Sequence, residues 1–132
     1  MLFRSEHGRV LKIEGAGGAL EFLPIPVEHG TNYTALGLRI GAAAYVPDVS
    51  RLSDEAMAAL AGLDLLILDA LRFKPHPTHF SVAEALAAIA VLKPKRAVLT
   101  NLHTDIDYLK LTNDLPDGIE LAFDGWSGSL PS

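Results

Sequence analysis

The sequence predicts a mixed α/β fold (α+β by some definitions) in a single domain covering residues 1–132. A β-meander comes first, and an α-β-α-β-β order follows it. Three observations support this prediction. Short strand-like runs separated by glycine turns fill the first third of the chain. Two helical segments with capping serines follow. The runs at 64–69 and 96–100 are short and almost continuously apolar, which is typical of strands buried on both faces.

The first half of the chain predicts the meander. Glycines lie between the first two strands and between the last two, where hairpin turns are expected. Pro24 and Pro26 lie within the second strand and favour an edge or irregular position, because each removes a backbone donor from the ladder. The expected strands span residues 10–14, 19–27, 31–40 and 42–46.

The second half of the chain predicts alternating helices and strands. Ser53 is a suitable N-cap for a short helix, and acidic residues follow it in the first turn. Ser81 precedes a longer helix, with Glu84 at the position that completes a capping box. The expected helices span 54–60, 82–92 and 108–113, and the expected strands span 64–69, 96–100 and 119–123.

Composition limits the classes of function. Hydrophobic residues make up 49% of the chain and charged residues 20%, so the chain is globular rather than disordered. The net charge of −5 disfavours a nucleic-acid partner. The absence of cysteine excludes disulfides and thiolate zinc sites, so a transition-metal site must use His, Asp or Glu. No apolar run is long enough to span a bilayer, so no membrane association and a cytoplasmic location are predicted.

Three metal-ligand side chains follow strand-like runs directly. His29, Asp48 and His103 each lie where an apolar strand passes into a loop. Imidazole and carboxylate groups held by rigid strand ends can bind a divalent ion. The alternative is that these residues only form hydrogen bonds within their own loops and turns.

A second cluster surrounds the start of the 82–92 helix. Asp69 ends a buried strand, and His76 and His79 lie in the proline-containing loop that follows. His79 lies close to a helix N-terminus, whose positive potential favours a neutral imidazole that can transfer protons. Alternatively, His79 only fastens the loop to the helix. His76 is the weaker candidate, and Asn101 lies just beyond the next strand.

These residues resemble motifs of the metallo-β-lactamase superfamily. The resemblance rests on residues 27–30, 44–50, 66–81 and 99–105, and it is closest to the phosphoribosyl cyclic phosphodiesterase branch of metal-dependent hydrolases. It implies that the chain is the C-terminal half of a four-layer αββα sandwich. It also implies hydrolysis of a phosphodiester by a hydroxide held between two zinc or manganese ions.

The resemblance assigns roles to four residues of this sequence. It implies that His29 binds the first metal ion, that Asp48 bridges the two ions, and that His103 binds the second. His79 matches a histidine that assists the leaving group or contacts the phosphate. Asp69, His76 and Asn101 are additional candidates for the same site.

The sequence departs from the family pattern in two ways. Many relatives have a histidine where this chain has Asn101, so we expect His103, two residues later, to take over that ligand role through a shifted loop. The family signature His-x-His-x-Asp-His, which supplies most ligands, is absent. We therefore expect weak or no metal binding by this chain alone, with little or no hydrolysis.

The missing half of the fold predicts a partner. One half of a four-layer sandwich would leave an apolar sheet face in water, and such faces normally bind something. We expect the chain to form a homo-oligomer or to pair with an N-terminal half, and then to act on a phosphodiester-type small molecule or nucleotide. The alternative is a truncated, non-catalytic remnant that serves as a dimerising or partner-binding module.

Overall fold

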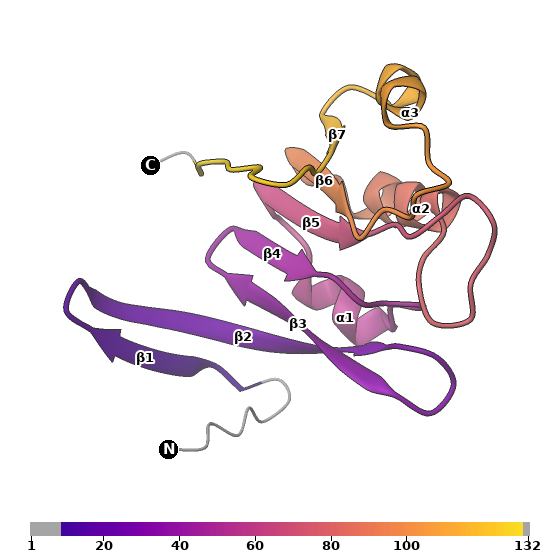
Figure 1. Cartoon of the computed structure of the whole chain (residues 1–132). Helices are drawn as coiled ribbons and strands as arrows, with labels where there is room; N and C mark the ends of the chain where they lie inside the picture. Colours follow the sequence, from indigo (N-terminus) through magenta and orange to yellow (C-terminus); the bar gives the residue numbers. More distant parts are fainter. Residues whose placement is uncertain (1–8, 131–132) are drawn as a thin grey trace.

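A computed structural model describes residues 9–130, and within them the chain forms one seven-stranded sheet in the order β1-β2-β3-β4-β5-β6-β7 (Figure 1). The pairs from β1 to β4 are antiparallel, and those from β4 to β7 are parallel. The strands are β1 (Leu11–Gly15), β2 (Gly18–Glu28), β3 (Thr34–Ile40), β4 (Ala43–Val46), β5 (Leu65–Asp69), β6 (Arg96–Thr100) and β7 (Ile119–Leu121). The helices are α1 (Asp54–Ala59), α2 (Val82–Leu92) and α3 (Tyr108–Asp114).

The predicted α/β class and element order are confirmed, and two boundaries differ from the prediction by more than one residue. The strand expected from residue 31 begins at Thr34, because the preceding residues turn and the His29 amide donates to the Tyr33 carbonyl at 2.9 Å. The last strand ends at Leu121 rather than at residue 123. A further turn follows there, in which the Trp126 amide donates to the Phe123 carbonyl at 2.9 Å.

The two prolines of β2 lie in a one-sided part of that strand, as the sequence predicts. β1 pairs with β2 only as far as Phe22, and β3 pairs with β2 from Leu23 onward. Within residues 9–130, Pro24 and Pro26 therefore have a neighbouring strand on one side only, where a missing amide donor is tolerated. The β1–β2 hairpin projects beyond the rest of the sheet (Figure 1).

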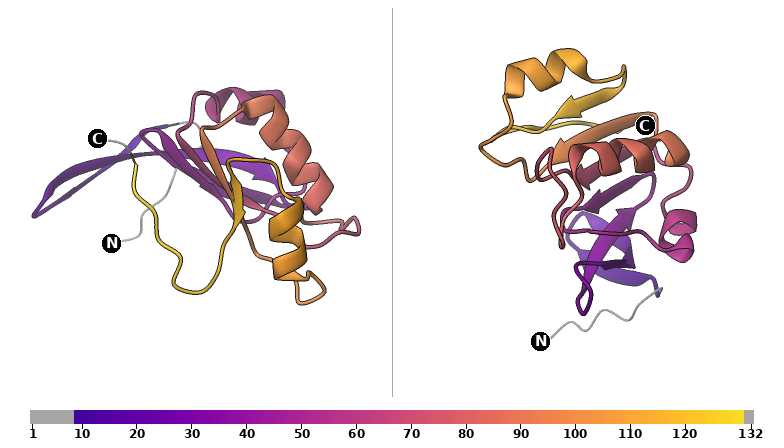
Figure 2. Two further views of the ribbon diagram at one scale, coloured as in Figure 1. Left: turned by 90° about the horizontal axis from the view of Figure 1, so that it is seen from above. Right: turned by 90° about the vertical axis from the view of Figure 1, so that its right-hand side faces the viewer.

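Helices α1 and α2 cover one face of the sheet (Figure 2). Leu60, at the end of α1, and Ile89 of α2 pack there against inward-facing strand residues such as Leu66, Leu68 and Leu99. Full burial of each such side chain stabilises the fold by about 1.5–3 kcal/mol. The longest described helix, α2, has 11 residues, so no helix among residues 9–130 has the length and apolar character to cross a bilayer.

The opposite face of the sheet carries no helix in the views of Figure 2. One register-aligned row crosses this face, and it consists of Pro24, Leu38, Tyr45, Ile67, Val98 and Glu120. Tyr45 is 48% exposed, whereas Val98 is fully buried. Part of the cover near Val98 comes from the segment after β7, where Trp126 packs over the Arg96 guanidinium. The part of the row from Pro24 to Val98 is therefore an apolar surface covered only in part.

The parallel strands bring polar residues to one edge. β4, β5 and β6 run in the same direction, so their C-terminal ends share an edge of the sheet. Asp69 ends β5 and Asn101 follows β6. Helix α2 begins at this edge with a complete capping box, in which Ser81 accepts from the Glu84 amide and Glu84 accepts from the Ser81 amide. This edge is where sites form in sheets of this kind.

Candidate metal centre

Three of the predicted site residues converge at this edge. His29 follows β2, Asp48 follows β4, and His79 lies in the loop between β5 and α2. One ligand atom from each lies within 4.8 Å of the other two. Two atoms that each lie about 2.1 Å from one ion are at most ~4.2 Å apart. Side-chain movements on the order of 1 Å would therefore bring the three ligand atoms around a zinc-sized ion.

The imidazole of His29 is held with one nitrogen free. Its Nδ1 atom lies 2.6 Å from the carbonyl oxygen of Thr78. A carbonyl oxygen only accepts hydrogen bonds, so Nδ1 carries the proton and Nε2 has a free lone pair. Gly30 permits this close approach, since its φ is +86° and an added Cβ would lie 3.0 Å from Cγ2 of Thr78.

The imidazole of His79 is held in the same way by a carboxylate. Its Nδ1 atom lies 2.7 Å from Oδ2 of Asp69. An ionised Asp69 can only accept, so Nδ1 of His79 again carries the proton and Nε2 is free. The rings of His29 and His79 meet edge to face with centroids 4.8 Å apart. Metal-bound histidines usually make this kind of outer hydrogen bond, because it fixes the tautomer and the ring orientation.

Asp69 is fully buried and has three hydrogen-bond partners, which are the Val49 amide, the His79 ring and the Asn101 side chain. Burial raises the pKa of its carboxyl, while the hydrogen bonds from Val49, His79 and Asn101 act in the opposite direction. The Val49 amide donates to Oδ2 at 3.1 Å, and Nδ2 of Asn101 donates to Oδ1 at 3.3 Å. Asn101 adopts φ +64°, a left-handed conformation that Asn tolerates better than most residues. Asp69 and Asn101 therefore act behind His79 in this geometry, as a support for its ring.

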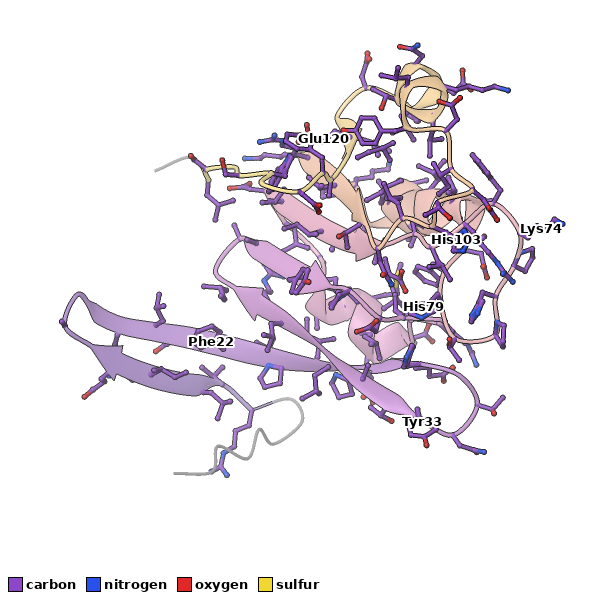
Figure 3. The ribbon with its side chains drawn as sticks, in the orientation of Figure 1. Phe22, Tyr33, Lys74, His79, His103 and Glu120 are labelled. Atoms are coloured by element: carbon purple, nitrogen blue, oxygen red, sulfur yellow. The ribbon has the colours of Figure 1, made fainter. Side chains whose placement is uncertain are left out.

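The structure does not bring His103 into the group of three. Its Nδ1 atom lies 3.1 Å from the Asp105 amide, which only donates, and 3.3 Å from Oδ2 of Asp105, which accepts from a protonated Nδ1. Figure 3 shows His103 and His79 at the same end of the sheet. The ligand role expected for His103 stays a prediction.

Sequence reasoning missed the backbone partners of the site. The Thr78 carbonyl orients His29, and the Val49 amide donates to Asp69. Backbone groups are present at every position, so residue type gives no indication of which of them contact a site. The loop geometry that selects these two arises only after β4, β5 and the segment before α2 have come together.

A family model described as beta-lactamase superfamily domain matches residues 4–101 of the chain. The chain belongs to this family. The match includes His29, Asp48, Asp69 and His79, so every residue of the group and the support of His79 lie within the family domain.

Several solved structures share the fold of this chain. A structure described as a new diphosphatase from the PhnP family has 37% identity and a TM-score of 0.88, over 96% of this chain and 48% of that chain. Zn²⁺-bound PqqB from Methylobacterium extorquens has 17% identity and a TM-score of 0.72, over 91% of this chain and 53% of that chain. The short form of human tRNase Z has 18% identity and a TM-score of 0.67, over 86% of this chain and 43% of that chain.

This chain spans only part of the proteins it resembles. It covers about half of each solved chain, at 48%, 53% and 43%. A curated octanoyltransferase from Porphyromonas gingivalis is 29% identical over 107 residues, which are 77% of this chain and 21% of that protein. At low identity, the PqqB and tRNase Z matches show the fold alone. The functions of all these proteins belong to chains that are much longer than this one.

Proposed function

We propose that this chain binds a divalent ion, zinc or manganese, through His29, Asp48 and His79, and that it works as the C-terminal half of a phosphoryl-ester hydrolase. The single observation that carries the proposal is the ligand group itself. Each of two imidazoles and one carboxylate offers a ligand atom within 4.8 Å of the other two, and both imidazoles have a free Nε2. Three protein ligands with an open position are what a catalytic zinc site requires.

The chemistry of the donor set fits such an ion. Neutral imidazole and carboxylate are borderline and hard ligands, respectively, and both suit Zn²⁺ and Mn²⁺. A bound ion would supply Lewis-acid chemistry to a phosphoryl substrate. The chain's own contribution is orientation, since Thr78 and Asp69 hold the two rings in place. Burial of Asp69 keeps water away from the bond that positions His79.

The proposed substrate class is a phosphodiester or phosphoanhydride of a small molecule or nucleotide. The diphosphatase of the PhnP family supports this class, since it shares 37% identity with nearly the whole chain. The acidic balance of this chain, with a net charge of −5, favours a small substrate over a long polyanion. The His–Asp–His group offsets that balance locally once an ion is bound.

We further propose that catalysis requires a second protein layer on the open face of the sheet. The apolar row through Leu38, Tyr45 and Ile67 supports this, as does the coverage of about half of each solved relative. The occupant that we propose is an N-terminal half of the same fold, which would add further ligands. Without it, we expect the chain to bind metal weakly and to turn over little substrate.

Calorimetric titration with Zn²⁺ and with Mn²⁺ tests the metal proposal. We expect one ion per chain, and we expect His29→Ala, Asp48→Asn and His79→Ala each to abolish binding. Asp117→Asn is the matched control, because it removes an exposed carboxylate from the turn before β7, at the other end of the sheet. If His103→Gln also abolished binding of the ion, His103 would belong to the ligand set. No metal uptake by the chain at any concentration would overturn the proposal.

Turnover separates a hydrolase from a remnant. Hydrolysis of bis(4-nitrophenyl) phosphate by the zinc-loaded chain, lost in His79→Ala, would support catalysis. A stable dimer with no metal uptake would support the non-catalytic, partner-binding alternative. A shift in electrophoretic mobility on addition of RNA, lost when salt is added, would point instead to a nucleic-acid-binding module.

A further inference from the structure

His76 lies beside the metal group but outside it. Its ring centroid is 5.3 Å from that of His79, and the planes are tilted by 55°. His76 is not among the three residues whose ligand atoms come together. The metal proposal therefore leaves a third imidazole at the rim of the site without a function.

The hydrogen bonds of His76 fix the tautomer opposite to that of the two ligand histidines. The Thr78 amide lies 3.1 Å from Nδ1 of His76, and the Thr78 hydroxyl lies 3.2 Å from the same atom. A backbone amide only donates, so Nδ1 must accept and the ring proton must be on Nε2.

This tautomer rules out one role and leaves another. Nε2 of His76 carries a hydrogen, so it cannot bind a metal ion in this geometry. Among residues 9–130, no atom accepts a hydrogen bond from that N–H. A neutral N–H donor beside a cation site is suited to an anionic oxygen, because it donates without adding a charge that would repel the ion.

The loop that carries His76 is braced at its base and along its length. The Leu71 amide donates to the Phe80 carbonyl at 2.9 Å, and the Val82 amide donates to the Arg72 carbonyl at 2.9 Å. The Arg72 side chain donates to the Lys74 carbonyl at 3.2 Å and to the Pro75 carbonyl at 3.0 Å. Lys74 marks the outer part of this loop in Figure 3. Little side-chain or loop freedom is then left to lose when a ligand binds.

We propose that His76 is a substrate-contacting residue whose Nε2–H donates a hydrogen bond to a non-bridging oxygen of a phosphodiester bound at the His29–Asp48–His79 group. This inference rests on the proposed function and deepens it, because it assigns the residue that recognises the anion. His76 neither binds the ion nor transfers a proton. Its contribution is to ground-state affinity, so its loss raises KM more than it lowers kcat.

Ring-nitrogen NMR of the ¹⁵N-labelled full chain tests the tautomer directly. We expect His76 to show the Nε2–H form, and His29 and His79 to show the Nδ1–H form. Adding Zn²⁺ should shift the Nε2 signals of His29 and His79 and leave the Nε2–H of His76 in place. A proton on Nδ1 of His76, or a zinc-induced shift typical of ligation at its Nε2, would overturn the inference.

Two variants of the zinc-loaded chain test the contact, with dimethyl phosphate as the probe. His76→Phe keeps a ring but removes the donor, and we expect a ~2- to 12-fold weaker Kd, as for one net hydrogen bond. His76→Gln keeps an N–H donor near the same position and should retain most of the affinity. Thermal unfolding of both variants confirms that they fold.

The outcomes distinguish this inference from the function beneath it. Failure of the wild-type chain to bind Zn²⁺ overturns the proposed metal function. Normal Zn²⁺ binding with unchanged dimethyl phosphate affinity in His76→Phe overturns the role of His76 alone. Acetate serves as the second arm, and an equal loss of acetate and dimethyl phosphate affinity would contradict recognition of a phosphodiester in particular.

Discussion

At the scale of residues, the four described histidines divide by what their Nδ1 atom faces. In His29 and His79 this atom faces an oxygen, a carbonyl and a carboxylate respectively, so each presents a free Nε2. In His76 it faces the Thr78 amide, so this residue presents an Nε2–H, while Nδ1 of His103 faces both the amide and the carboxylate of Asp105. One residue type thus supplies two potential metal ligands and a hydrogen-bond donor at the same end of the sheet.

Asp69 holds the ring of His79 in place, so a change at Asp69 should alter zinc binding. Asp69→Asn replaces an obligate acceptor with an amide that can turn its NH₂ toward His79, which favours the wrong ring tautomer. We expect zinc affinity to fall about 10- to 100-fold, as for other outer-sphere partners of metal-bound histidine. Calorimetric titration measures the change. Unaltered zinc affinity in a folded Asp69→Asn variant would show that this hydrogen bond does not position the ligand.

Residue type and chain position predicted which side chains come together better than they predicted the contacts of those side chains. His29, Asp48 and His79 could be selected because each is a ligand-type side chain at the end of a strand or beside a helix start. Their tautomers depend on partners far along the chain, such as Thr78, which lies 49 residues after His29. Residue spacing carries no information on such contacts. The expectation that His103 acts as a ligand through a shifted loop depends on such contacts as well.

At the scale of elements, the cap of α2 holds the end of the site loop. Ser81 is 2% exposed and forms both halves of a capping box with Glu84. We expect Ser81→Ala to lower the free energy of unfolding by about 1 kcal/mol, in the range ~0.5–2. Urea denaturation measures this loss, and Ser127→Ala, an exposed position beyond β7, is the control. Equal stability of the two variants would mean that the box contributes nothing.

Local rules predicted the elements well because this sequence marks its boundaries with residues of specific geometry. Helix α2 matches its predicted range, since Ser81 and Glu84 define its start and Pro94 prevents its continuation. The start of β3 was placed three residues too early, because Tyr33 and its neighbours have strand-like composition but belong to a turn. That turn is set by its backbone hydrogen bond to His29, which composition does not encode.

The turn after β2 gives a prediction with a matched control. Gly30 and Gly41 both have positive φ, at +86° and +56°, but only Gly30 has a close neighbour for an added Cβ, Cγ2 of Thr78 at 3.0 Å. Gly30→Ala should therefore destabilise the fold more than Gly41→Ala, whose cost is about 1 kcal/mol of backbone strain. It should also weaken zinc binding, since displacement of Thr78 releases His29. Thermal unfolding and calorimetry measure both effects, and identical behaviour of the two variants would exclude the contact as a determinant.

At the scale of the whole molecule, helices cover one face of the sheet and leave the other face open. Helices α1 and α2 and the β-strand residues beneath them bury the first face. The second face is covered near Val98 but exposed near Tyr45. The metal group lies at the edge between these two faces, so a layer added to the open face would come close to the ion. Completion of the fold and completion of the site are therefore one event in this proposal.

Assembly of the chain should depend on the open face of the sheet. Without an N-terminal half, we expect copies of the chain to pair through the row that includes Tyr45 and Ile67, because contact removes apolar surface from water at about 25 cal/mol per Å². Tyr45→Lys should shift the dimer to a monomer in light scattering. Val91→Lys is the control, since Val91 is 71% exposed on α2, over the opposite face. A wild-type chain that stays monomeric at all concentrations, or a dimer that Val91→Lys disrupts and Tyr45→Lys does not, would place any interface elsewhere.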